Sequence, residues 1–517
     1  MLIKIYSAAP VGIEAVPVTI EVHSVPGFDF TLVGLPDNAV KESHERIIAA
    51  LTVNNLEQLR YSFTINMAPA DIKKEGAAFD LPLAIGMLAG AEKVKTQLLA
   101  HYMIMGELSL DGSLQPIRGA LPIALCARKA GLKGLILPAA NADEAAVVEG
   151  LEVYGLNNLK EVIRFLNGEP FEPTYVDTQS LFDELAFPSD LDFSDVRGQF
   201  KVRRAVEIAA AGGHNMIMVG PPGAGKSMIA KRIPSILPPL TLEEALETMK
   251  IHSIAGLTNK RKGARGALIV QRPFRSPHHT ITDVALVGGG TNPHPGEISL
   301  AHNGVLFLDE LPEYKRSVLE VMRQPLEDRH ITVARTKETV DYPASFMLVA
   351  AMNPCPCGHY GENNPAHPCT CTPAQVHRYL SKISGPLLDR IDIQCEIEAV
   401  PYEQLRDTQP GESSAAIRER VLRARAIQTE RFKHSKLVHC NAMMSTKMVR
   451  QYCALDNECD KLLELTMTKL GLSARAYDRI LKVARTIADI EGSEHIQKQH
   501  LLEAISYRSL DRSNWAG

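Results

Sequence analysis

Apolar and polar positions follow different periods in different parts of this chain. Over residues 1–168, short strand-like runs alternate with helical patterns. The strand-like runs are residues 18–22, 30–33 and 61–65, and the helical patterns are residues 77–89 and 121–130. This alternation predicts an N-terminal domain of mixed strands and helices over residues 1–168.

A change in composition marks the end of that domain. Segment 167–195 contains Pro170, Pro173 and Pro188 among acidic residues, which predicts a linker over residues 169–191. An α/β pattern follows over residues 192–400, and a helical pattern predicts a C-terminal helical domain over residues 401–517. Its helices are expected at residues 414–431, 446–453, 457–470, 473–490 and 497–507.

Overall composition narrows the class of protein. The 517 residues are 45% hydrophobic and 22% charged, as in ordinary globular proteins, and no apolar run approaches the roughly 20 residues of a membrane span. With a net charge of −4, any DNA contact must come from a local basic patch. Nine cysteines without an export signal indicate a reducing compartment, so we expect a cytoplasmic protein that binds no membrane.

A glycine-rich sequence follows the apolar run 216–219. It consists of Gly220, Pro221, Pro222, Gly223, Ala224, Gly225, Lys226 and Ser227, which is the spacing of a phosphate-binding loop between a strand and a helix. Lys226 would reach the β- and γ-phosphates, and the Ser227 hydroxyl would ligate Mg²⁺. The alternative is a plain glycine-rich turn, but the strand–loop–helix context favours binding of ATP with Mg²⁺.

Polar residues that follow two further apolar runs suit the same chemistry. Run 305–308 ends in Asp309 and Glu310, which would orient the Mg²⁺ shell and polarise the attacking water, respectively. Asn353 follows run 346–352, where its amide would hold the lytic water or the γ-phosphate. Such residues are often plain turn residues, but their order behind the phosphate loop favours an ATP-hydrolysing site.

Cys355, Cys357, Cys369 and Cys371 form two Cys-x-Cys pairs in one polar loop, residues 355–371. Four thiolates brought together suit tetrahedral Zn²⁺, and so many cysteines in so short a loop favour a metal site. Four reduced thiols or an artefact of thiol oxidation are the alternatives, because Cys-x-Cys is tighter than the usual spacing of zinc ligands.

Together these residues resemble the AAA+ ATPases, and within them the magnesium-chelatase-like branch. Segments 192–199, 209–215 and 275–280 carry much of the likeness, which covers essentially the whole chain and is similar to the ComM/YifB group. The resemblance implies an α/β fold, in which a Lon-protease-like α+β domain (S5 domain 2-like) precedes an AAA+ core with a parallel sheet and a helical lid. It also implies a homo-hexameric ring, and the group includes a DNA helicase that promotes branch migration. His278 and His279 in segment 275–280 receive no role.

Two arginines become candidates through this resemblance. Arg390 follows a short turn and resembles the finger that acts on a neighbouring subunit's ATP, whereas Arg475 opens a helix and resembles the second sensor. A guanidinium beside the γ-phosphate stabilises transition-state charge, and removing a finger costs roughly 10³–10⁵ in rate. Taken alone, each arginine is a surface salt-bridge residue.

Two basic segments lie where chelatase-like proteins carry insertions that point into the pore of the ring. The first contains Lys260, Arg261, Lys262 and Arg265, and the second is a predicted hairpin over residues 329–342 with Arg335 and Lys337 near its tip. Their contacts to DNA phosphates would be independent of sequence, as a translocating motor requires. Solvated charged turns are the alternative.

The N-terminal domain resembles Lon proteolytic domains in segments 74–78 and 106–117. This chain has Ala78 and Leu121 at the positions of the catalytic serine and lysine. A methyl and an isobutyl group cannot form a Ser–Lys dyad, so we expect an inactive domain that serves as a scaffold, an oligomerisation surface or a DNA-docking surface.

The leading hypothesis is a hexameric ATP-driven motor that acts on single-stranded, duplex or branched DNA. The resemblance implies that this motor promotes branch migration during homologous recombination in natural transformation. The alternative is an ATP-dependent metal-insertion or protein-remodelling chaperone of the magnesium-chelatase type. The missing dyad argues against a third class, an ATP-dependent protease.

Overall fold

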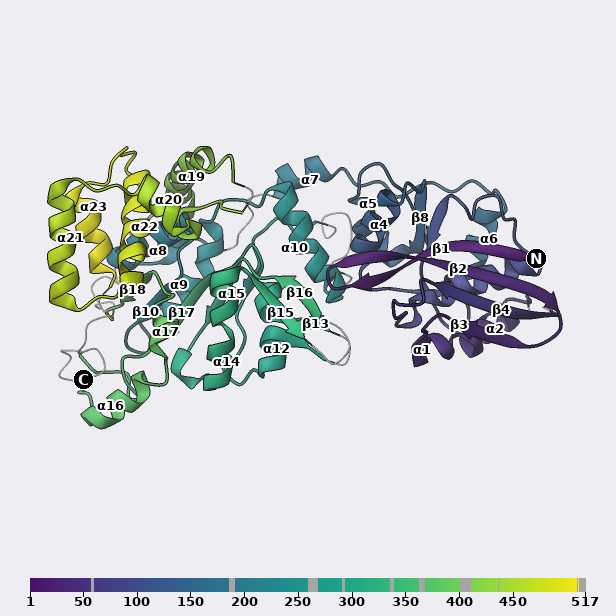
Figure 1. Ribbon diagram of the computed structural model, residues 1–517, viewed down its shortest axis with the longest axis horizontal. Helices are drawn as coiled ribbons and strands as arrows, with labels where there is room; N and C mark the ends of the chain where they lie inside the picture. The colour runs from purple at the N-terminus through teal and green to yellow at the C-terminus, as the bar shows by residue number, and fades with distance from the viewer. Residues whose placement is uncertain are drawn as a thin grey trace.

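The computed structural model describes residues 1–56, 60–185, 191–258, 268–290, 293–334, 339–361, 368–399, 411–435, 437–508 and 510. Figure 1 shows an elongated molecule with the N-terminal sheet at one end, a second sheet in the middle and the C-terminal helices at the other end. In the part of the chain that the structure describes, no helix is both long and apolar enough to cross a membrane.

A seven-stranded sheet organises the N-terminal part, in the order β3-β4-β2-β1-β5-β8-β9. Strands β1 and β2 are antiparallel from Leu2↔His23 to Val11↔Glu14, and β5, β8 and β9 run parallel. The strands are β1 (Leu2–Val11), β2 (Glu14–Pro26), β3 (Phe30–Val33), β4 (Tyr61–Ala68), β5 (Tyr102–Ile104), β8 (Gly134–Pro138) and β9 (Glu152–Leu156), beside the short pair β6 (Glu107–Leu108) and β7 (Leu114–Gln115). The helices are α1 (Asn38–Lys41), α2 (Ser43–Val53), α3 (Asp80–Gly90), α4 (Ala120–Lys129), α5 (Ala142–Ala146) and α6 (Leu159–Leu166). The mixed strands and helices predicted here are confirmed.

The central sheet has five parallel strands in the order β11-β14-β17-β10-β18. They are β10 (Met216–Val219), β11 (Phe274–Arg275), β14 (Val305–Leu308), β17 (Met347–Met352) and β18 (Ile393–Glu396). Around them lie α8 (Phe200–Gly212), α9 (Lys226–Arg232), α10 (Leu242–Ile254), α12 (Asp283–Val287), α13 (Glu297–Leu300), α14 (Arg316–Val321), α15 (Arg323–Asp328), α16 (Pro373–Leu380) and α17 (Gly385–Leu388). The predicted parallel sheet is confirmed, as is the hairpin, which is β15 (His330–Ala334) paired with β16 (Thr339–Pro343). A second small ribbon joins β12 (Gly288–Gly289) to β13 (His294–Pro295).

The C-terminal helices lie within one residue of their predicted bounds. They are α19 (Ser414–Arg431), α20 (Thr446–Tyr452), α21 (Asn457–Leu470), α22 (Ala474–Ile490) and α23 (Lys498–Ser506). The first four begin after Ser413, Ser445, Asp456 and Ser473, whose side chains each accept a hydrogen bond from a backbone N–H three residues on. Such caps satisfy donors that the first turn leaves unpaired, which is why the local sequence defines these boundaries well.

The N-terminal and central parts share a packed interface as well as a connecting segment. Within the predicted linker the structure has a helix, α7 (Thr178–Leu185), so that segment is not structureless. Helix α10 packs into the N-terminal core. At its end the buried Glu144 carboxylate accepts hydrogen bonds from the Ser253 hydroxyl, the Thr258 hydroxyl and the Leu121 backbone N–H. These contacts fix the central part against the N-terminal part.

Candidate ATP site

Three parallel strands of the central sheet end side by side, and each is followed by predicted site residues. Val219 of β10 pairs with Met352 of β17, and Leu308 of β14 pairs with Ala350 of β17. The carboxyl ends of parallel strands meet at one sheet edge, where α/β proteins bind ligands. The phosphate loop, the acidic pair and Asn353 therefore converge on this edge.

The phosphate loop connects β10 to α9, which begins at Lys226. Gly223 and Gly225 have φ angles of 78° and 86°, a left-handed conformation that residues with a Cβ rarely adopt. The Lys226 ammonium donates to the carbonyl oxygens of Gly220 (2.6 Å) and Pro221 (2.8 Å) and to Oδ1 of Asn353 (3.0 Å). Burial lowers the pKa of Lys226, and the charge of Asp309 opposes that effect. The ammonium thus lies between the loop and Asn353, where a phosphate oxygen can replace a loop carbonyl as its partner.

Ser227 and Asp309 offer a pair of oxygen ligands. The Ser227 hydroxyl donates to Oδ2 of Asp309 over 2.6 Å, which links the first turn of α9 to the end of β14. A hydroxyl and a carboxylate are the oxygen ligands that Mg²⁺ takes beside the phosphates of a nucleotide. These residues therefore fit Mg²⁺, whose chemistry here would be to neutralise charge on the β- and γ-phosphates.

Glu310 is held in an unusual backbone conformation beside a histidine. Its φ is 52°, uncommon for a residue with a side chain, and its carboxylate lies 3.1 Å from Nδ1 of His279. The His279 ring lies against that of His278, with ring centroids 4.1 Å apart and the ring planes tilted by 34°. Sequence analysis gave these histidines no role. These histidines follow β11, which pairs with β14, the strand that precedes Glu310. A strand of only two residues shows no alternation of apolar and polar positions, so the sequence pattern did not reveal this pairing.

Arg390 and Arg475 lie near each other but away from this edge. Arg475 is 3.8 Å from Asp389, the neighbour of Arg390 in sequence. Arg390 precedes β18, whose first residue pairs with Met216, at the amino end of β10. The four-residue strand β10 separates that end from the phosphate loop by roughly 13 Å at about 3.3 Å per residue. The structure therefore brings these two arginines together, but not to the phosphate loop of their own chain.

The Arg390 guanidinium is almost covered by its own chain. Its exposed fraction is 6%, and it donates to the Pro386 carbonyl over 2.6 Å and to the Glu327 carboxylate. Its Nε has no hydrogen-bond partner among the described residues. Glu327 itself is 53% exposed, so this pair can open toward solvent.

A buried cluster around Asp392 joins the central sheet to the C-terminal helices, and sequence analysis did not identify it. The Asp392 carboxylate pairs with Arg479 of α22, lies 3.2 Å from Nδ1 of His214 and accepts from the Asn215 backbone N–H. The other ring nitrogen of His214 is 2.8 Å from the Thr486 hydroxyl. The cluster fixes α22 against the start of β10.

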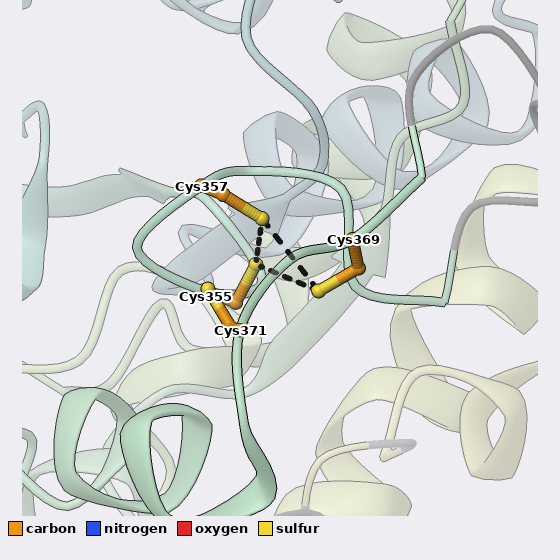
Figure 2. Close-up of side chains that lie close together, drawn as sticks. All are labelled: Cys355, Cys357, Cys369 and Cys371. Carbon is orange, nitrogen blue, oxygen red and sulfur yellow. Dashed lines mark hydrogen bonds between the residues drawn. The ribbon is translucent and has the colours of Figure 1, made fainter.

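The structure brings the four predicted metal ligands together, whereas the six basic residues predicted to contact DNA lie outside the described residues. The sulfurs of Cys355, Cys357, Cys369 and Cys371 all lie within 4.8 Å of one another (Figure 2). A hydrogen bond from the His359 backbone lowers the pKa of the Cys357 thiol to about 5. The residues predicted to contact DNA, which are Lys260, Arg261, Lys262, Arg265, Arg335 and Lys337, lie outside the described residues.

Three adjacent parallel strands end in a phosphate loop, an acidic pair and a polar residue, and a helical domain follows them in the chain. This arrangement defines a P-loop ATPase of the AAA+ type. Residues 192–405 match the family described as magnesium chelatase, subunit ChlI. Residues 20–141 match subunit ChlI of Mg-chelatase, and residues 411–508 match its C-terminal family.

Full-length relatives narrow this class. The chain is 46% identical to YifB of Escherichia coli and 44% identical to the competence protein ComM of Haemophilus influenzae, in each case over 98% of this chain and 97% of the relative. The chain belongs to the ComM/YifB-type, magnesium-chelatase-like family of AAA+ proteins. A 124-residue stretch, 24% of this chain, is also 26% identical to 22% of Lon protease 2 of Bacillus subtilis. AAA+ membership implies ATP and Mg²⁺ as cofactors.

Proposed function

We propose that this protein is a hexameric ATP-driven motor that moves along DNA and promotes branch migration during homologous recombination in natural transformation. The proposal of a ring is supported by one observation: the phosphate-binding residues and the two candidate arginines of the ATP site lie apart within one chain. The phosphate loop, Glu310 and Asn353 lie at the carboxyl edge of the sheet, and Arg390 and Arg475 lie at the amino end of β18. A head-to-tail ring supplies the arginines of one subunit to the phosphate loop of the next.

In this ring each side chain has a distinct task. Lys226 binds the transferred phosphate, while Ser227 and Asp309 hold Mg²⁺. Glu310 takes a proton from water as it attacks, and the Asn353 amide orients that water. Arg390 of the neighbouring subunit exchanges the Glu327 carboxylate for the γ-phosphate and stabilises the charge that develops on it.

DNA is proposed to pass beside the junction of the N-terminal and central parts. A cavity of about 380 Å³ lies there, lined by Ile254 of α10 and Val340 of β16. Its charged lining is mixed: Lys73 and Arg118 are basic, whereas Glu75, which pairs with Lys73, and Glu107 are acidic. In the sequence, α10 ends a few residues before the first basic segment, and β16 follows the second. Ala78, at the position of the Lon nucleophile, lines the same cavity. The name of the competence protein relative supports DNA as the load.

The test of the motor is hydrolysis and strand movement measured together. ATPase activity is measured without DNA and with single-stranded, duplex and four-way-junction DNA, and branch migration is followed by the release of labelled arms. We expect DNA to stimulate hydrolysis and the arms to separate only with ATP. Glu310→Gln is the matched control, because this variant should still bind ATP but should no longer hydrolyse it. Unchanged hydrolysis and intact junctions would refute the DNA motor.

A mixing experiment tests the shared site separately. Lys226→Ala and Arg390→Ala subunits are each expected to be nearly inactive. In a randomly mixed ring about a quarter of the interfaces join an intact loop to an intact arginine, so co-expression should restore about a quarter of the activity. If Arg390 served its own chain, no interface would be complete and mixing would restore nothing.

The family match also favours a second candidate, a metal-insertion or protein-remodelling chaperone of the chelatase type. This candidate shares the ring and the ATP chemistry but not the load. It predicts stimulation of the ATPase by a protein partner and none by DNA.

A further inference from the structure

The proposed motor activity makes no use of the four-cysteine cluster. Figure 2 shows the side chains of Cys355, Cys357, Cys369 and Cys371 gathered from two passes of one loop. Cys355 Sγ is 3.3 Å from Cys357 Sγ and 3.8 Å from Cys369 Sγ, and the last two sulfurs are 3.6 Å apart. All four sulfurs fall within 4.8 Å of one another. Within the described residues this is the group of side chains best suited to holding a metal.

These separations match a tetrahedral thiolate site. A tetrahedron with metal–sulfur bonds of about 2.3 Å has sulfur–sulfur edges of about 3.8 Å. Disulfide bonding needs about 2.05 Å, and all four cysteines are free thiols. Four thiolates without a nitrogen or oxygen ligand favour Zn²⁺ over Mg²⁺ or Ca²⁺.

The cluster is built against the ATP site. Cys355 is fully buried and lies two residues after Asn353, which accepts a hydrogen bond from Lys226. The Gly358 backbone N–H donates to the Cys355 carbonyl over 3.0 Å, which closes a tight turn. A Cβ on Gly358 would come within 2.6 Å of Cδ of Pro222, so this turn packs directly on the phosphate loop.

The second cysteine pair leads into a helix. Cys371 directly precedes Thr372, the N-cap of α16, where Thr372 and Gln375 form a capping box. Val376, Tyr379 and Leu380 of this helix belong to the same buried cluster as Cys355. A metal bound by both pairs would therefore tie the end of β17 to the start of α16.

We propose that the four thiolates bind one structural Zn²⁺, which holds the turn at residues 355–358 against Pro222 and so fixes the geometry of the phosphate loop. The ion does not contact the reacting phosphate, and its only effect is to hold the turn at residues 355–358 in place. Losing it frees the turn from the phosphate loop while the rest of the sheet stays folded.

Metal analysis tests the site itself. The purified protein should contain about one equivalent of zinc per chain, and a Cys369→Ser/Cys371→Ser variant should contain almost none. Cys126→Ser, in the N-terminal domain, is the matched control and should retain the metal. Reloading the chelated wild type with Co²⁺ should produce the thiolate-to-cobalt charge-transfer absorption of a tetrahedral site. Absent or substoichiometric metal, iron in place of zinc, or full zinc in the double variant would overturn the proposal.

Nucleotide affinity tests the link to the phosphate loop. Chelated wild type should bind a fluorescent ATP analogue about tenfold more weakly, and Zn²⁺ should restore the affinity. Circular dichroism of the same samples should show retained helix, which separates this effect from unfolding. Because the assay uses the wild-type sequence, it stands even if the double variant fails to fold. Unchanged affinity after complete zinc removal would refute the link, whether or not DNA stimulates the ATPase.

Discussion

Replacing Asp392 by asparagine removes one charge from the junction of the central sheet and the C-terminal helices while keeping the shape of the side chain. The carboxylate is 3% exposed and is surrounded by the Arg479 guanidinium, His214 Nδ1 and the Asn215 backbone N–H. Removing one member of a buried ion pair typically costs 3–5 kcal/mol, because the other charge loses its partner. Arg479 is 22% exposed and so keeps some water, which favours the lower end, about 3 kcal/mol.

This cost should appear as easier opening of α22 and β18. A loss of about 3 kcal/mol raises the population of the open form about 150-fold, so protected amides there should exchange about 150-fold faster. The thermal midpoint of the transition should fall by about 6–12 °C. Hydrogen exchange with mass spectrometry measures the first quantity, and amides of the N-terminal sheet provide an internal reference.

Asp389→Asn is the matched control, because it makes the same chemical change three residues away. Asp389 is 31% exposed and lies 3.8 Å from Arg475, so its loss should cost below about 0.5 kcal/mol. Equal exchange in the two variants would refute the reasoning, because it would mean that the buried cluster contributes no more than a surface pair.

The same cluster predicts a pH dependence. Burial alone would raise the pKa of Asp392, but the charge of Arg479 and the hydrogen bond of His214 outweigh it and hold this pKa below its usual range. A lowered pKa contributes stability that is full above the unfolded-state value of about 3.9 and is lost as the pH falls below it. The difference in unfolding free energy between wild type and Asp392→Asn should therefore shrink below about pH 4, as measured by urea titration.

Three further predictions concern the ATP site. Lys226→Ala should weaken binding of a fluorescent ATP analogue about 10- to 100-fold, because charged hydrogen bonds contribute about 1.5–3 kcal/mol; near-normal binding would contradict its role. Glu310→Gln should bind ATP normally but hydrolyse it about 10²- to 10⁴-fold more slowly in a phosphate-release assay, and retained turnover would remove Glu310 from catalysis. His279→Gln breaks a partly exposed pair that contributes about 1 kcal/mol at most, so kcat should change less than about fivefold. A larger change would mean that His279 acts directly on the reacting groups.

Features encoded within a few neighbouring residues were predictable from the sequence. The C-terminal helices begin after capping side chains such as Ser413 and Asp456, and their amphipathic period continues to the next break. The phosphate loop is equally local, because glycine spacing and the preceding apolar strand define it. The convergence of Asp309 and Asn353 on that loop was predictable because parallel strands end at one edge.

Features that depend on distant chain segments were not predictable in this way. His214 and Asp392 are separated by 178 positions and meet only because β10 and β18 pair. His279 reaches Glu310 through β11, which is too short to show alternation. Helix α7 was not predicted, because the prolines and acidic residues of segment 167–195 indicated a linker. The eight residues of the helix itself contain no proline.

The positions of the arginines give the proposed ring a route from one ATP site to the next. Arg479 holds Asp392, which lies two residues beyond Arg390, and Arg475 opens the same helix, α22. In the proposed ring, γ-phosphate bound to one subunit would therefore attract the buried Arg390 and the exposed Arg475 of its neighbour, whose chain segments are both tied to Asp392. Release of that phosphate would free Arg390 to return to Glu327, and the Asp392 cluster connects this segment to α22 and to the start of β10. Because β10 ends in the neighbour's own phosphate loop, this connection would let hydrolysis in one subunit of the proposed ring influence the next ATP site, which is the coupling that ordered firing around a ring requires.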